Sequence, residues 1–140
     1  MIEYENHDAL GLAELVRRGD VTPGELLDAM LERQARDNPR LNAVVTPLHD
    51  AARAQIAAGL PDGPFRGVPF LVKELVASVM GTPTTFASRL YANNLPKSDS
   101  EVVARLRRAG LVIAGKTNSP EFGLSPVTES LLYGVTRNPW

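Results

Sequence analysis

The chain has 140 residues, of which 44% are apolar, so we expect one soluble domain of ordinary size with a sizeable core. Its 15 Lys and Arg residues against 16 Asp and Glu residues leave a formal net charge of -1, which excludes a broad binding surface for nucleic acid or an anionic membrane. The absence of cysteine excludes a disulfide framework, a thiolate zinc site and a cysteine nucleophile, and the distant His7 and His49 predict no metal-ligand pair.

The N-terminus lacks the pattern of a targeting segment. Glu3, Glu5, Asp8 and Glu14 stand where a signal peptide needs a basic start and an apolar stretch, and no window approaches membrane-spanning length. We therefore expect a cytoplasmic protein.

Residues 1–58 predict a helical lead-in. Asp8 can cap a short helix that runs through Val16 and is stopped by Gly19. A second helix should start at Thr22-Pro23-Gly24-Glu25, which has the spacing of a capping box with proline at the first helical position. We expect Pro39 to close this helix, a short strand over 41–45, and a third helix over 48–58.

Residues 59–140 differ in composition from residues 1–58, because 16 of the 22 Gly and Pro residues fall there. We expect a buried strand over 68–73, a long loop over 75–97, a helix that starts near Ser98 and ends at Gly110, a strand over 111–114 and a loop from 115 onward. This order predicts an α/β fold.

Residues 110–117 match the phosphate-binding pattern G-x-x-x-x-G-K-[ST] at every fixed position. A phosphate loop needs a strand before it and a helix after it, whereas here a helix comes first and the variable residues are themselves strand formers. A nucleotide-binding module is therefore kept only as an alternative.

Lysine is scarce, with three Lys against twelve Arg, and two of the three end the apolar strand candidates. Loss of hydration at the end of a buried strand disfavours an ammonium and favours a general base. The ordinary alternative is that the aliphatic part of the lysine side chain extends along the protein and the amine reaches solvent. Position alone therefore does not make Lys73 catalytic.

The longer string around these lysines resembles the N-terminal part of the amidase signature enzymes. The segments that carry the resemblance are Gly67 to Leu75, Asp99-Ser100, Ala109-Gly110, Gly115-Lys116-Thr117-Asn118, Pro120 to Gly123 and Tyr133 to Trp140. Their order and spacing fit throughout, and the Thr-Arg-Asn-Pro-Trp ending is similar to that of amidases acting on linear or cyclic oligoamides.

The resemblance implies a mixed β-sheet sandwiched by helices, with residues 59–140 as the first part of the amidase core. It also implies hydrolysis of a carboxamide by a Ser-cisSer-Lys arrangement, without cofactor or metal, in which Lys73 is the terminal base. Glu74 stands where the family commonly has Asp. Gly123 and Leu124 match a segment that lines the substrate cavity, and Lys116, Asn118 and Glu121 are expected to be structural polar residues.

The family's glycine- and serine-rich segment follows the Asn-Pro-Trp string, so the two catalytic serines have no counterpart here. We therefore expect this chain alone to be inactive on amides. The expected partners are a small-molecule amide and either a second copy of the chain or a complementing C-terminal chain, with no nucleic acid or membrane. A role as one chain of a transamidating complex is a further alternative.

Overall fold

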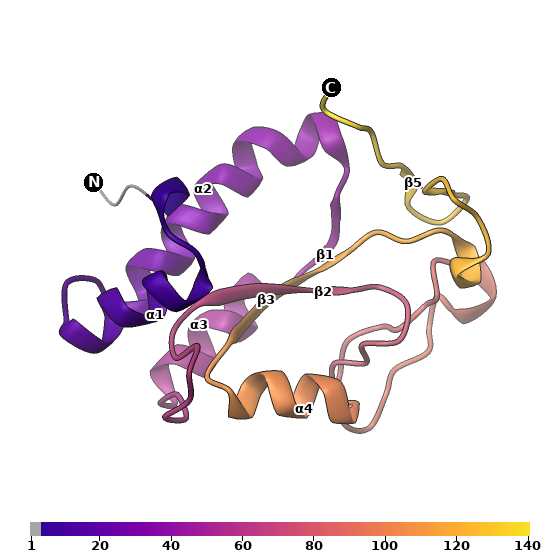
Figure 1. Cartoon of the computed structure of the whole chain (residues 1–140). Coiled ribbons are helices and arrows are strands. Elements are labelled where there is room, and N and C mark those ends of the chain that lie inside the picture. Colours follow the sequence, from indigo (N-terminus) through magenta and orange to yellow (C-terminus); the bar gives the residue numbers. More distant parts are fainter. Residues whose placement is uncertain (1–3) are drawn as a thin grey trace.

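The computed structural model describes residues 4–140, which form a three-stranded sheet with helices on both faces (Figure 1). The strands are β1 (Val44–Pro47), β2 (Pro69–Lys73) and β3 (Val112–Thr117), in the order β1-β3-β2. The central β3 pairs antiparallel with β1 and parallel with β2. This arrangement confirms the predicted α/β class.

The first two helices begin and end where local capping chemistry predicts. Asp8 caps α1 (Ala9–Arg18) by accepting from the Gly11 backbone N-H at 2.7 Å, and Gly19 ends it in the left-handed region. In α2 (Pro23–Leu41), Thr22 and Glu25 form the complete capping box.

The C-terminal end of α2 differs from the sequence prediction, because the helix continues through Pro39 to Leu41. Asn42 then ends it with φ 52, and the Asn38 side chain accepts from the backbone N-H groups of Ala43 and Val44 at 2.9 and 2.7 Å. These contacts give hydrogen-bond acceptors to the backbone N-H groups that follow the helix. The strand therefore begins later than the predicted range 41–45, and it is β1, Val44–Pro47. The third helix, α3 (His49–Ala57), lies within its predicted range.

Between β2 and β3 the chain forms an irregular segment and one helix, α4 (Glu101–Arg108). The irregular segment contains a single turn of 3-10 helix, Arg89–Tyr91, which agrees with the predicted long loop. Beyond β3 come the 3-10 turn Glu121–Gly123 and a small hairpin of β4 (Glu129–Ser130) and β5 (Gly134–Val135). A further 3-10 turn, Tyr4–Asn6, precedes α1.

The strand β3 extends three residues beyond its predicted end and includes Gly115, Lys116 and Thr117. The string that matches the phosphate-loop pattern is thus mostly a central strand, and Lys116 is fully buried. A strand paired on both sides has no free backbone N-H groups to wrap a phosphate, so the nucleotide-binding alternative is wrong.

A β-bulge changes which face of the sheet the end of β3 presents. Phe70 pairs with Ile113 and Leu71 pairs with Gly115, so Ala114 is an extra residue in β3. Ala114 packs with α2 and α3, as regular alternation from Val112 requires. After the extra residue the alternation is reversed, and Lys116 lies on the opposite face.

The core is divided between the two faces of the sheet. On one face, Val112 and Ala114 pack with Leu27 of α2 and Ala52 of α3. On the other, Val72 and Ile113 pack with Val103 of α4 and with the start of the long loop. A third cluster joins α1 and α2 to Val68 and Leu111, the residues directly before the starts of β2 and β3. No helix within residues 4–140 is long and apolar enough to cross a membrane.

Candidate active site

Lys73 is the last residue of β2, an edge strand of the described sheet. It pairs with Thr117 at the end of β3, so the ends of the two parallel strands meet there. Strand alternation places Lys73 on the same face as Leu71, opposite the buried Val72. Its position at the carboxyl end of parallel strands is one that α/β proteins use for ligand binding.

The environment of Lys73 differs from the expected apolar one. Its side chain is exposed, and within residues 4–140 it has no hydrogen-bond or ion-pair partner. Among the apolar residues that precede Lys73, Val68 and Val72 are buried in the core, but Phe70 is itself 38% exposed. The described residues therefore present Lys73 on an open surface.

Directly after Lys73 the chain enters a buried polar network around Glu74. The Glu74 carboxylate forms an ion pair with Lys116, and both side chains are completely buried. Its Oε1 accepts from the backbone N-H and the hydroxyl of Thr85 at 2.6 and 3.0 Å, and Lys116 is the sole polar contact of Oε2 within residues 4–140. The carboxylate is thus held from both oxygens.

Lys116 is held as completely as Glu74. Its ammonium also donates to the Pro83 carbonyl at 2.7 Å and to the Thr84 hydroxyl at 3.1 Å. Burial lowers the pKa of Lys116, and the hydrogen bond and charge of Glu74 oppose this effect. The amine has three acceptors and no exposed surface, so it is a structural group rather than a free base.

The other two residues expected to be structural have different outcomes. Asn118 is buried, and its amide donates to the Gly134 carbonyl and the Thr136 hydroxyl at 3.2 and 2.9 Å. Glu121 is exposed and makes no described polar side-chain contact among residues 4–140. The structural interpretation fits Lys116 and Asn118, and no contact supports it for Glu121.

Gly123 and Leu124 lie at the 3-10 turn that follows β3. Phe122 and Gly123 both adopt left-handed backbone conformations, with φ 51 and 72, and a Cβ at Gly123 would lie 3.0 Å from the side chain of Leu75. Leu75 is two residues beyond Lys73, so this turn lies against the segment that leaves the lysine. Leu124 is 85% exposed.

Aromatic packing holds this turn against the long loop. The Phe122 ring stacks on Phe86 at 6.0 Å, Tyr91 meets both rings edge-on, and the Phe122 N-H donates to the Phe86 carbonyl at 2.9 Å. Phe86 and Ala87 also have positive φ values, 53 and 55. Non-glycine residues in this region are strained and occur often at functional sites.

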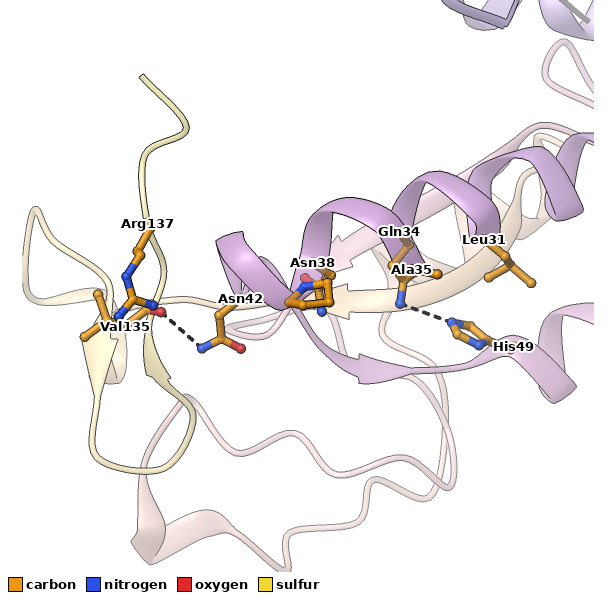
Figure 2. Close-up of a pocket in the computed structure, with 9 residues that line it drawn as sticks. Leu31, Gln34, Ala35, Asn38, Asn42, His49, Val135 and Arg137 are labelled. Carbon is orange, nitrogen blue, oxygen red and sulfur yellow. Dashed lines mark hydrogen bonds between the residues drawn. The ribbon is translucent and has the colours of Figure 1, made fainter.

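A pocket lies elsewhere, along the C-terminal half of α2 (Figure 2). It encloses about 560 Å³, and its polar lining includes Gln34, Asn38, His49 and Arg137. Figure 2 shows the contact of 3.2 Å between Gln34 and the His49 ring, and the Asn42 amide donating to the Val135 carbonyl. Lys73 does not line this pocket, so it is not the site of the predicted chemistry.

Sequence reasoning misses how Glu74 and Lys116 are connected. It identifies Glu74 only as a substitute for Asp, and Lys116 as a polar residue of a loop, although both residues follow a run of buried strand formers. Two opposite charges at the ends of neighbouring parallel strands are a signal for an ion pair. The role of Thr85 carries no local signal, because this residue comes from the long loop that follows β2.

Comparison with known proteins agrees with this architecture. The chain is 41% identical over 135 residues to 6-aminohexanoate-cyclic-dimer hydrolase from Paenarthrobacter ureafaciens, covering 95% of this chain and 27% of that protein. It is 42% identical to a glutamyl-tRNA(Gln) amidotransferase chain from Salinispora arenicola, covering 100% of this chain and 30% of that protein. The solved structure of a 6-aminohexanoate cyclic dimer hydrolase superimposes with a TM-score of 0.92 at 38% identity, covering 100% of this chain and 29% of that one.

The similarity includes the sheet and both of its helical faces, and the chain spans about three-tenths of the length of these relatives. The structural match also confirms the predicted fold, the N-terminal part of the amidase signature architecture. The Amidase family model matches residues 25–140, from the capping box of α2 to Trp140. The chain therefore belongs to the Amidase family.

Proposed function

We propose that the protein containing this chain hydrolyses a carboxamide bond and that Lys73 is its terminal base. The observation that carries the proposal is the position of Lys73, at the carboxyl end of the edge strand β2, with an amine that no group within residues 4–140 engages. A general base must be within reach of the proton donor, whereas Lys116 is enclosed within β3, where it donates to the Pro83 carbonyl and the Thr84 hydroxyl and pairs with Glu74.

In the proposed mechanism a serine attacks the amide carbonyl while a second serine passes its proton to the Lys73 amine. The same relay returns a proton to the leaving nitrogen as the C-N bond breaks, and water then hydrolyses the acyl-serine. None of the serines among residues 4–140 is described in contact with Lys73; the buried Ser119, for example, donates to the Glu74 carbonyl at 3.1 Å. The two serines are therefore assigned to the part of the family architecture that these 140 residues do not include. On this basis we propose that the isolated chain does not turn over amides.

We propose that the turn at Gly123 and Leu124 contributes to the wall of the substrate site. Support comes from its packing against Leu75 and from the exposure of Leu124, which offers an apolar surface near the segment that carries Lys73. An apolar wall suits a substrate with hydrocarbon segments, such as the linear or cyclic oligoamides on which similar hydrolases act.

The test uses the polypeptide as its host produces it, assayed for new amino groups formed from a linear and from a cyclic oligoamide and for ammonia released from a simple primary amide. We expect Lys73→Ala to lower turnover by about 10²–10⁴-fold, the usual contribution of a general base. Lys97→Ala is the matched control, because Lys97 is a lysine outside the strands with no described partner within residues 4–140, and it should keep full activity. Unchanged turnover in Lys73→Ala would refute the proposal.

A transamidating role is the second candidate, favoured by the 42% identity to an amidotransferase chain over the whole of this one. A hydrolase should turn over a small amide as a purified single polypeptide. A transamidating enzyme should need its partner chains and should transfer the amide nitrogen to an acceptor other than water. Turnover that appears only after partner chains from the host are added would therefore favour this candidate.

A further inference from the structure

The buried ion pair between Glu74 and Lys116 lies one residue from the proposed base, yet its charged groups cannot reach a substrate because both side chains are fully buried. We propose that this pair positions Lys73, by fixing the peptide that follows it and the direction in which its side chain leaves the strand. The inference rests on the proposed function and adds Glu74 and Lys116 to it as positioning residues.

The first support is that residue 74 is held at every polar group. Its N-H donates to the Thr117 carbonyl at 2.8 Å, its carbonyl accepts from the Ser119 hydroxyl at 3.1 Å, and its carboxylate is bound by Thr85 and Lys116. Consecutive Cα atoms are about 3.8 Å apart, so a fixed residue 74 leaves little freedom to the backbone of Lys73.

The second support is the alternation of faces at the end of β2. Val72 and Glu74 point to the same buried face, where Val72 lies in the α4 cluster and Glu74 meets Lys116. Lys73 lies between them and must point to the opposite face. Since β2 ends at Lys73, the ion pair continues the alternation one residue past the strand and prevents the lysine from turning inward.

The third support is that the same network leads to the Gly123 turn. The Thr85 hydroxyl, which donates to Glu74, lies 3.1 Å from the Tyr133 hydroxyl, and the next residue, Phe86, accepts from the Phe122 N-H at 2.9 Å. The backbone after Lys73 and the turn proposed to line the substrate site are thus joined through two residues of the long loop. Their separation is fixed by this connection.

The choice of an ion pair rather than an apolar contact is consistent with positioning. Burying two charges removes their hydration, which their mutual attraction often only offsets, and apolar pairs of similar volume are often at least as stable. An ion pair has a defined direction and distance, whereas apolar side chains can repack. The ion pair therefore contributes a fixed position and direction for the Lys73 side chain rather than additional stability.

The test compares Glu74→Gln, Glu74→Asp and Leu27→Ala in the polypeptide as its host produces it, by steady-state kinetics on an amide that the unmutated protein hydrolyses. Glutamine keeps an acceptor for Thr85 and removes the charge that faces Lys116. We expect kcat to fall about 100-fold, the cost of misplacing a catalytic group by about 1 Å, with KM within about twofold of its original value. Aspartate keeps the charge and should restore most of kcat.

Leu27→Ala is the control for loss of stability alone, because Leu27 is fully buried on the other face of the sheet. It should lower stability and leave kcat within about threefold of its original value. Hydrogen exchange gives a readout that needs no turnover. In Glu74→Gln it should accelerate over residues 72–88 more than in the rest of the chain, whereas Leu27→Ala should show no such local excess.

Two results separate the failure of this inference from the failure of the proposed function. An active protein whose kcat is unchanged by Glu74→Gln, or lowered equally by Leu27→Ala, would overturn the positioning role and leave the amidase proposal standing. No hydrolysis of any amide by the unmutated protein would overturn the proposed function and this inference with it.

Discussion

Replacing Lys116 by methionine removes the positive half of the buried ion pair while keeping a side chain of similar length. The Glu74 carboxylate would then keep its two hydrogen bonds from Thr85 at Oε1, but Oε2 would lose its sole polar contact among residues 4–140. Breaking a buried pair in this way costs about 3–5 kcal/mol. Folded domains have free energies of unfolding of about 5–15 kcal/mol, so a loss of this size is a large fraction of such a total.

The Glu74→Leu variant also leaves one uncompensated buried charge, so we expect a cost of about 3–5 kcal/mol, similar to that of Lys116→Met. The Lys116 amine would keep the Pro83 carbonyl at 2.7 Å and the Thr84 hydroxyl at 3.1 Å, so it remains hydrogen-bonded. The Thr85 N-H would lose its acceptor, and an unsatisfied buried donor costs about 1–3 kcal/mol. The double variant leaves the same donor unpaired but buries no charge, so we expect it to cost about 2 kcal/mol.

The measurement is urea unfolding, monitored by far-ultraviolet circular dichroism, of the unmutated protein, Lys116→Met, Glu74→Leu and the variant that carries both substitutions. The losses of unfolding free energy in the two single variants should add up to at least about 2 kcal/mol more than the loss in the double variant. A difference of this size lies within the range of coupling between residues in contact. Single costs that add to the double cost within about 0.5 kcal/mol would refute the coupling that we infer.

Three further predictions concern other parts of the chain. Gly110→Ala should destabilise by about 2–4 kcal/mol, since its Cβ would lie 2.6 Å from the Arg66 backbone, whereas Gly59→Ala, at nearly the same φ with nothing within 4 Å, should cost about 1–2 kcal/mol in thermal unfolding. Because the pKa of Lys116 is lowered, the unfolded chain binds more protons than the folded one between that pKa and the ordinary value of 10.5. The stability of the unmutated protein relative to Lys116→Met should therefore rise with pH in that window. A difference in stability that does not change with pH would contradict this. Thr22→Ala should cost about 1 kcal/mol through loss of the capping box, measured by urea unfolding, with Thr128→Ala, outside any helix cap, as a control.

The parts of the fold that can be predicted correctly depend on neighbours in sequence. Asp8 and Thr22 start their helices through contacts to residues three positions away, and these are visible in the sequence itself. The prediction for the end of α2 is wrong, because Pro39 is a local stop signal, whereas the helix is closed by Asn42 and by the Asn38 side chain.

The candidate site can be predicted in position but not in environment. The apolar run before Lys73 places it at a strand end, as the structure has it. The burial of Lys116 depends on the extra residue Ala114 in β3 and on loops that arrive from far along the chain, and the exposure of Lys73 depends on which of these loops cover the end of β2. A bulge reverses every later side chain of a strand, and the register that creates it exists only once two distant strands have paired.

The junction between the end of α2 and the hairpin of β4 and β5 also bears on how this sequence can change. Asn42 donates to the Tyr133 and Val135 carbonyls at 2.7 and 3.2 Å, and Thr136 donates to the Asn42 carbonyl at 2.7 Å. The acceptors are backbone atoms, which every residue type supplies. Homologues can therefore exchange the side chain of Val135 without losing the junction, whereas a change of Asn42 requires a compensating donor elsewhere.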